Sequence, residues 1–97
     1  MRHEIIFAPV AITDLRLLRA FECAAIQDAI EHHLRFEPER VSKSRIKRLR
    51  GLKYPQYRLR VDEYRVHYNV TVGRVEIVSI VPKADTEKWL QEYGVPE

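Results

Sequence analysis

Residues 57–68, with the sequence YRLRVDEYRVHY, contain side chains that can hold a phosphate group. If Asp62 and Glu63 form a two-residue turn, the segments on either side pair as antiparallel strands. Side chains alternate across a strand, so one face of this hairpin is apolar and the other carries a basic cluster. The basic cluster consists of Arg58, Arg60, Arg65 and His67. Because like charges directly opposite each other destabilise a strand pair, the cluster indicates an anionic partner.

The residue types in the basic cluster suit a reacting phosphodiester. A guanidinium group is planar, stays charged and offers paired donors to two phosphate oxygens. Positioned donors of this kind stabilise the charge that develops in a transition state. His67 lies beside the arginines, which favour its neutral form and so suit it to act as a base. The structural alternative is a surface sheet whose arginine side chains cover neighbouring apolar groups and whose histidine only packs.

The sequence lacks the residues that other common kinds of catalytic site need. The remaining histidines are scattered and no carboxylate completes a ligand set, so we expect no metal and no other cofactor. A glycine-rich phosphate loop and the nucleophile motifs of hydrolases are absent, and the single cysteine, Cys23, excludes a disulfide framework. A metal-free ribonuclease is compatible with the residues present, because RNA supplies its own nucleophile in the neighbouring 2′-hydroxyl.

Positive charge is concentrated in the middle of the chain. Residues 35–65 contain eleven basic and four acidic side chains, a net charge of +7, whereas residues 1–34 and 66–97 each contain three basic and five acidic side chains, a net charge of −2. Much of the excess precedes the basic cluster, at Lys43, Arg45, Lys47, Arg48, Arg50 and Lys53. Residues 37–53 show no clean period, so we expect a long loop that binds RNA phosphates whatever the base sequence. Alternatively, the loop packs on the sheet through apolar side chains such as Ile46 and leaves its charges solvated.

The expected secondary structure places the basic cluster in an α+β arrangement of strands and helices. The elements are an N-terminal strand at residues 3–7, a helical hairpin formed by a helix from Pro9 and one at about 22–35, the basic loop, a three-stranded antiparallel meander, and a C-terminal helix with Trp89 and Tyr93. A turn at Gly73 and Arg74 in the meander places Val66 opposite Val81. The helices must cover the apolar face, and we expect the polar face to stay at least partly open.

The composition favours a single domain over residues 1–97. With 45% hydrophobic and 32% charged residues, a chain of this length forms one modest core. No apolar run approaches the ~18 residues of a membrane span, and the N-terminus lacks the apolar region of a signal peptide. We therefore expect a cytoplasmic protein that has no membrane partner.

The run IKRLRGLKYPQYRLRVDEYRVHYNV, followed by a hairpin and VSIVPK, resembles the RelE/ParE superfamily of bacterial toxins from type II toxin–antitoxin systems. The resemblance covers nearly the full chain. Its most specific part is a basic residue flanking a strand residue, then a short turn, then YR followed by an apolar residue, any residue and Tyr. It implies a small cytoplasmic toxin that a cognate antitoxin neutralises in a hetero-oligomer. RelE-like members cleave messenger RNA in the ribosome, so the mRNA and the ribosome are further implied partners.

The same resemblance implies roles for individual residues. It carries the family's basic strand residues onto Arg58 and Arg60, and the arginine of its YR onto Arg65. It places Lys83 where a basic residue follows the last strand. The expected catalytic residues are therefore these four, with His67 added from its position beside the arginines.

Two positions depart from the family pattern. The second catalytic arginine of the family falls near Ala84, and its C-terminal tyrosine falls near Leu90. Trp89 and Tyr93 are neighbours of Leu90, and Tyr93 or Lys83 is the expected substitute if the terminal helix folds over the site.

These departures leave two alternatives to RNA cleavage. The ParE branch of the superfamily has a similar fold, acts on DNA gyrase and needs no ribonuclease site. The other alternative is an inactive homologue that only binds an antitoxin. Three arginines on one face favour RNA cleavage, whereas Ala84 and Leu90 favour the alternatives.

Overall fold

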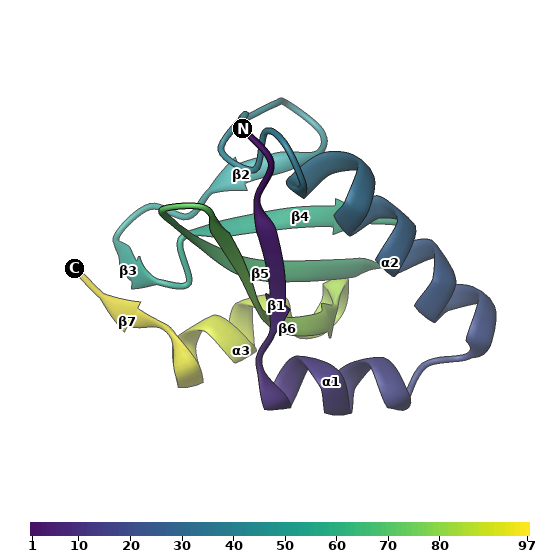
Figure 1. The fold of residues 1–97 in the computed structure, drawn as a ribbon. Coiled ribbons are helices and arrows are strands. Elements are labelled where there is room, and N and C mark those ends of the chain that lie inside the picture. The colour runs from purple at the N-terminus through teal and green to yellow at the C-terminus, as the bar shows by residue number, and fades with distance from the viewer.

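A five-stranded mixed sheet lies at the centre of the computed structural model, which describes residues 1–97 (Figure 1). Its strands, in the order in which they lie side by side, are β1 (Glu4–Phe7), β6 (Arg74–Pro82), β5 (Tyr64–Thr71), β4 (Tyr57–Val61) and β2 (Ile46–Arg48). β1 is parallel to β6, and the other neighbours are antiparallel. A second, two-stranded sheet joins β3 (Leu52–Tyr54) to β7 (Val95–Pro96), at the left of Figure 1.

Three α-helices accompany the sheet, namely α1 (Pro9–Arg16), α2 (Ala20–Leu34) and α3 (Thr86–Tyr93), and a 3₁₀ turn, η1 (Lys83–Asp85), precedes the last. Pro9 occupies the first turn of α1, where its missing N–H has no helical partner. The fold class is therefore α+β, as predicted, with β1 and β2 added to the expected three-stranded meander. None of the helices combines the length and the hydropathy of a membrane span.

The apolar core lies between α2 and one face of the sheet. Ile26, Ile30 and Leu34 recur every four residues on α2 and are almost fully buried. The same core contains the sheet residues Leu59, Val66, Tyr68, Val75 and Ile77. Because β4 and β5 carry apolar side chains at alternate positions, α2 covers this face, and the basic cluster faces the other way.

The hairpin of β4 and β5 has the predicted register. Its turn is at 62–63, with Arg60 opposite Arg65 and Arg58 opposite His67. Asp62 has a φ of 51°, in the left-handed region that Asp adopts more readily than most residues. Alternation and turn chemistry therefore predicted this hairpin residue by residue.

The turn between β5 and β6 differs from the prediction by one residue. It is formed by Val72 and Gly73, and Arg74 already pairs with Thr71 in the strands. Gly73 has a φ of 72°, which only glycine adopts without strain. The predicted turn at Gly73 and Arg74 is therefore wrong, because the positive φ is needed at the second turn position.

A bulge in β6 corrects the predicted pairing further along the same hairpin. His67 lies opposite Ser79 and Tyr68 opposite Ile77, so Val78 has no partner across the ladder. Val66 consequently pairs with Ile80, and its predicted pairing with Val81 is wrong. The extra residue redirects the following side chains of β6 to the opposite faces of the sheet.

The predicted loop at 37–53 is wrong, because it contains two strands. β2 pairs with β4 at the edge of the main sheet, and its Ile46 is buried opposite Leu59. β3 pairs with β7 instead, so the C-terminal residues return to this part of the chain. Strands of three residues are too short to show a period, so the sequence pattern gave no sign of them.

A candidate nucleic-acid interface on the sheet

Five basic side chains lie in two rows across β2, β4 and β5. The first row runs from Arg45, just before β2, through Arg60 to Arg65, and the Arg60 N–H donates to the Arg45 carbonyl at 2.9 Å. The second row runs from Lys47 to Arg58, which lies opposite the buried His67. Residues directly opposite each other on neighbouring strands share a face of the sheet. We call Arg45, Lys47, Arg58, Arg60 and Arg65 together the arginine face.

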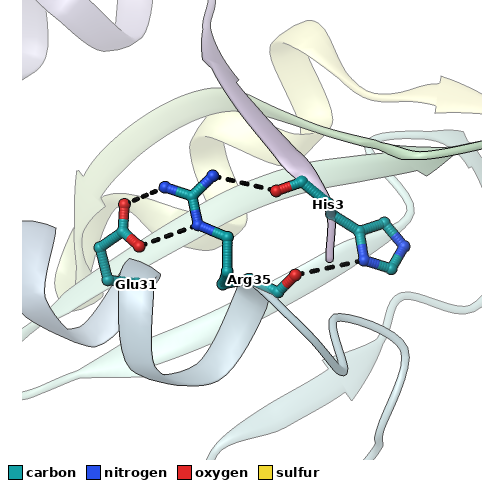
Figure 2. Close-up of polar contacts among 3 residues, drawn as sticks. All are labelled: His3, Glu31 and Arg35. Carbon is teal, nitrogen blue, oxygen red and sulfur yellow. Dashed lines mark hydrogen bonds and ion pairs between the residues drawn. The ribbon is translucent and has the colours of Figure 1, made fainter. Parts of the chain in front are cut away.

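No carboxylate neutralises the arginine face. The chain has three ion pairs, and none of them includes a residue of this face: Arg35 with Glu31, Arg40 with Glu37, and Arg74 with Glu4. Figure 2 shows the contrast at Arg35, whose guanidinium binds the Glu31 carboxylate and donates to the His3 carbonyl at 3.0 Å, joining α2 to the N-terminal segment. The charges of the arginine face are therefore left for an external anion.

The arginines of this face differ in exposure. Arg45, Lys47 and Arg60 are exposed, Arg58 is partly buried, and Arg65 is only 7% exposed. Burial lowers the pKa of Arg58, and the charges of Arg65 and Arg60 lower it further. Burial likewise lowers the pKa of Arg65, with a further contribution from Arg60. A bound anion would offset this mutual repulsion.

Arg65 is committed to the turn that precedes it. Its Nη1 donates to the carbonyls of Asp62, at 3.0 Å, and of Tyr64, at 2.9 Å. The guanidinium thus satisfies two backbone acceptors of the β4–β5 turn and is poorly accessible to a ligand. Arg65 therefore holds the hairpin and adds positive charge beside Arg60, its partner across the two strands.

His67 is buried under α3. Its ring stacks on Trp89 with the centroids 4.9 Å apart and the planes 15° from parallel, and its Nδ1 lies 2.9 Å from the Ser79 hydroxyl. Burial lowers its pKa to about 4, with a smaller effect of Arg58. Both His67 Nε2 and Arg58 Nε are buried without a hydrogen-bond partner. This geometry disfavours the predicted role of His67 as a general base and leaves it a packed, neutral side chain.

The polar face is consequently less open than expected. α3 covers the part of it around His67 and Ser79, which are both fully buried, and Asn69 is 8% exposed. Tyr93 lies against Trp89 with a centroid separation of 5.2 Å and is more than half exposed. The terminal helix therefore does fold over the sheet, and Trp89 rather than Tyr93 stacks on His67.

Lys83 lies beside the turn of the arginine face. Its N–H donates to the Glu63 carbonyl at 2.7 Å, and its side chain is exposed at the start of η1. Ala84, where the family pattern has an arginine, is exposed next to it. Leu90 lines a groove of about 520 Å³ with Lys47, Arg50 and their neighbours. Lys83 is therefore an exposed basic residue beside the β4–β5 turn, at one end of the sheet.

The predicted RNA-binding segment divides into three parts. Arg45 and Lys47 belong to the arginine face. Arg48 lies on the opposite side of β2, with its guanidinium carbon 5.2 Å from the centre of the Tyr57 ring and its Nη1 donating to the Gln56 carbonyl at 2.7 Å. The remaining three are exposed outside this face, at Lys43, Arg50 and Lys53.

No family model and no curated protein matches the sequence. Solved structures do match. One is a chain of the RelBE2 toxin–antitoxin complex of Mycobacterium tuberculosis, with a TM-score of 0.67 and 25% identity over 84% of this chain and 99% of that one. Others come from the RelB–RelE antitoxin–toxin complex of Methanococcus jannaschii (TM-score 0.65, 20% identity, 87% and 96% covered) and the archaeal RelE–RelB complex of Pyrococcus horikoshii OT3 (TM-score 0.64, 22% identity, 86% and 97% covered). The last two agree in fold alone. In its architecture, this chain is RelE-like.

Proposed function

We propose that this chain is the toxin of a toxin–antitoxin pair and that it cleaves messenger RNA at the ribosome, in the cytoplasm, without a metal. The observation that carries the proposal is the arginine face, a group of basic side chains with no carboxylate partner on a RelE-like sheet. Such a face suits a polyanion, and RNA is the polyanion that needs no protein nucleophile for its cleavage.

The proposed reaction is attack of an RNA 2′-hydroxyl on the adjacent phosphorus. The 2′-oxygen forms a bond to phosphorus, the bond to the 5′-oxygen of the next nucleotide breaks, and a cyclic phosphate remains. Arg58 and Arg60 donate to the phosphate oxygens, whose negative charge grows in the transition state. Lys83, exposed beside the turn, delivers the proton to the departing 5′-oxygen, and solvent takes the proton of the 2′-hydroxyl.

The proposed protein partner is an acidic antitoxin segment that is disordered alone and folds on this chain. The matched structures are antitoxin–toxin complexes, which supports such a partner. An acidic segment inhibits by covering the arginine face or by displacing α3. Co-purification with the product of the neighbouring gene should give a stable hetero-oligomer, and a chain that stays fully toxic when saturated with that product contradicts the assignment.

The test of the proposal is brief expression of the chain, followed by sequencing of the 5′ ends of cellular messages. We expect growth arrest and new 5′ ends within coding regions. Arg60→Ala should abolish both, because it removes an exposed donor to the phosphate. Arg16→Ala is the matched control, since Arg16 is an exposed arginine on α1 and should leave cleavage unchanged. Arrest without new 5′ ends would contradict RNA cleavage.

A second candidate function is favoured by the burial of His67 and Arg65. His67 lies beneath α3 and Arg65 is bound to the turn, so few exposed side chains of the arginine face can transfer protons. This is expected for a ParE-like gyrase inhibitor or an inactive antitoxin-binding homologue. A gyrase inhibitor would change plasmid supercoiling and damage DNA while messages stay intact. An inactive homologue would bind antitoxin without arresting growth.

A further inference from the structure

A basic cavity lies where α2 ends and β2 begins, and Arg45 is the one residue that it shares with the arginine face. Its volume is about 510 Å³, within the range of small-ligand sites. The polar residues that line it are His32, His33, Glu37, Arg40, Ser42 and Arg45. Apart from Arg45, neither the sequence motif nor the proposed reaction uses any of them.

The cavity is positively charged, and its arginine side chains are free to bind an anion. Its one carboxylate, Glu37, lies 3.4 Å from Arg40, and both side chains are largely exposed, at 65% and 75%. Exposed ion pairs of this kind are weak, so Arg40 can exchange Glu37 for a phosphate. The nearby carboxylate of Glu39 accepts from the Tyr57 hydroxyl at 3.4 Å instead. Arg40 and Arg45 therefore offer two guanidinium groups to an anion.

The cavity also contains a free hydroxyl donor and two aromatic rings. Ser42 Oγ accepts from the N–H groups of Arg45, at 3.0 Å, and Ile46, at 3.2 Å, so its own hydrogen is left to donate. The rings of His32 and His33 meet edge to face, 4.7 Å apart. Burial lowers the pKa of His33, and His32 and Arg45 lower it further, which favours a neutral ring. Aromatic rings next to phosphate donors suit a nucleobase.

Arg45 connects the cavity to the arginine face. Its Nη1 donates to the Arg60 carbonyl at 3.1 Å, and its own carbonyl accepts from the Arg60 N–H at 2.9 Å. We propose that the cavity binds a more distant nucleotide of the RNA strand whose scissile phosphate lies on the arginine face, with Arg40 and Arg45 on its phosphate and the two imidazoles on its base. This inference rests on the proposed function. An acidic peptide would use the arginines but not the rings, so RNA is the occupant that fits both.

The inference is tested with fluorescently labelled, 2′-O-methylated RNA, which binds but is not cleaved. We expect Arg40→Gln to weaken binding of an oligonucleotide of about nine residues roughly tenfold, and to reduce its salt slope by about 0.7. A trinucleotide, which fills the arginine face alone, should bind the variant and the wild type equally. Arg16→Gln on α1 is the matched control and should change neither affinity.

A second measurement does not depend on substitution. In proton NMR spectra, the longer RNA should shift the ring signals of His32 and His33, and the trinucleotide should leave them unchanged. Equal affinity of wild type and Arg40→Gln for the longer RNA would overturn the inference and leave the proposed function intact. Failure of the wild type to bind either RNA would overturn both. Loss of polyglutamate binding in Arg40→Gln, with RNA binding unchanged, would overturn the inference in favour of an acidic protein.

Discussion

Arg60 and Arg65 face each other across β4 and β5, yet their side chains do different things. Arg60 is exposed and forms no ion pair, so its charge is available to a ligand. Arg65 is buried and donates to the carbonyls of Asp62 and Tyr64. One arginine of the pair is therefore exposed and without an ion pair, and the other holds the turn.

This difference predicts opposite effects of two alanine substitutions. Arg65→Ala leaves two turn carbonyls without their donor and should lower the free energy of unfolding by about 1–3 kcal/mol. Arg60→Ala should change it by no more than about 0.5 kcal/mol, because Arg60 is an exposed side chain. Urea denaturation of both variants measures the difference. Relief of like-charge repulsion alone would make Arg65→Ala neutral or stabilising, and that result would show that its hydrogen bonds contribute little.

The burial of His67 makes stability depend on pH. Burial under α3 lowers its pKa in the folded chain to about 4, from an ordinary value of 6.5 in the unfolded chain. Between these two values the unfolded chain binds more protons than the folded one. His67 should therefore leave the free energy of unfolding unchanged above about pH 6.5. As the pH decreases from there toward 4, this free energy should fall, by at most about 1.4 kcal/mol per pH unit.

Urea denaturation of matched variants across this pH window tests that dependence. His67→Gln should flatten the pH dependence of the unfolding free energy, whatever it does to stability at neutral pH. Gln27→Ala changes an exposed, non-titrating side chain on α2 and should keep the wild-type dependence. A slope that is the same in His67→Gln and wild type would mean that other groups cause it.

At the scale of elements, α3 is attached to the sheet by few side chains. None of its residues is fully buried, and Trp89 makes the stacking contact with the sheet through His67. At its end, a Cβ on Gly94 would collide with the Leu90 carbonyl and press on Leu52, so glycine lets the chain turn toward β3. These few contacts predict that α3 can detach from the polar face while the rest of the sheet stays folded.

Trp89→Ala should release α3 while leaving the rest of the sheet folded. We expect hydrogen exchange of the amides in α3 and β7 to accelerate at least tenfold, with the amides of β4 and β5 unchanged. Gln91→Ala, at an exposed position of the same helix, is the matched control. Equal acceleration throughout the sheet would show instead that α3 and the core unfold together.

β2 separates two neighbouring basic residues by face, and this predicts different effects for them. Lys47→Gln should reduce RNA affinity and lower the salt slope by about 0.7, with little change in stability. Arg48→Gln should lower the free energy of unfolding by about 1–2 kcal/mol, because it loses its contacts with Tyr57 and Gln56, and should keep the slope. RNA titrations across salt concentrations, with urea denaturation of each variant, distinguish the two. Equal slopes for both variants would place Lys47 outside the binding surface.

For the whole molecule, the sequence predicted those parts of the fold that depend on local pattern. Alternation with a turn at 62–63 defined the first hairpin, and a stripe of apolar residues defined α2. The short strands β2, β3 and β7 were not predictable in this way, because two or three residues show no period and their partners are distant in sequence. The bulge at Val78 likewise depends on packing around β6 rather than on its own composition.

The sequence predicted which residues of the candidate site come together better than it predicted how their side chains are placed. The register of β4 and β5 placed three arginines and His67 together, as the structure has them. The burial of His67 was not foreseen, because the apolar stripe of α3 indicates that it packs but not on which face of the sheet. Trp89 lies 22 positions after His67, and no local signal joins them. The split between Lys47 and Arg48 also required the strand pairing of β2 to be known.

The parallel pairing of β1 with β6 also has a consequence for the order of synthesis. Glu4 pairs with Arg74, 70 positions later, so the first strand to leave a ribosome stays without its partner until the last strand of the main sheet has emerged. The hydrogen bonds between Arg35 and His3 in Figure 2 can form much earlier in synthesis, because both residues belong to the first third of the chain. A nascent chain halted before β6 therefore has its helices but lacks the completed sheet, and a truncated product should be inert rather than partly toxic.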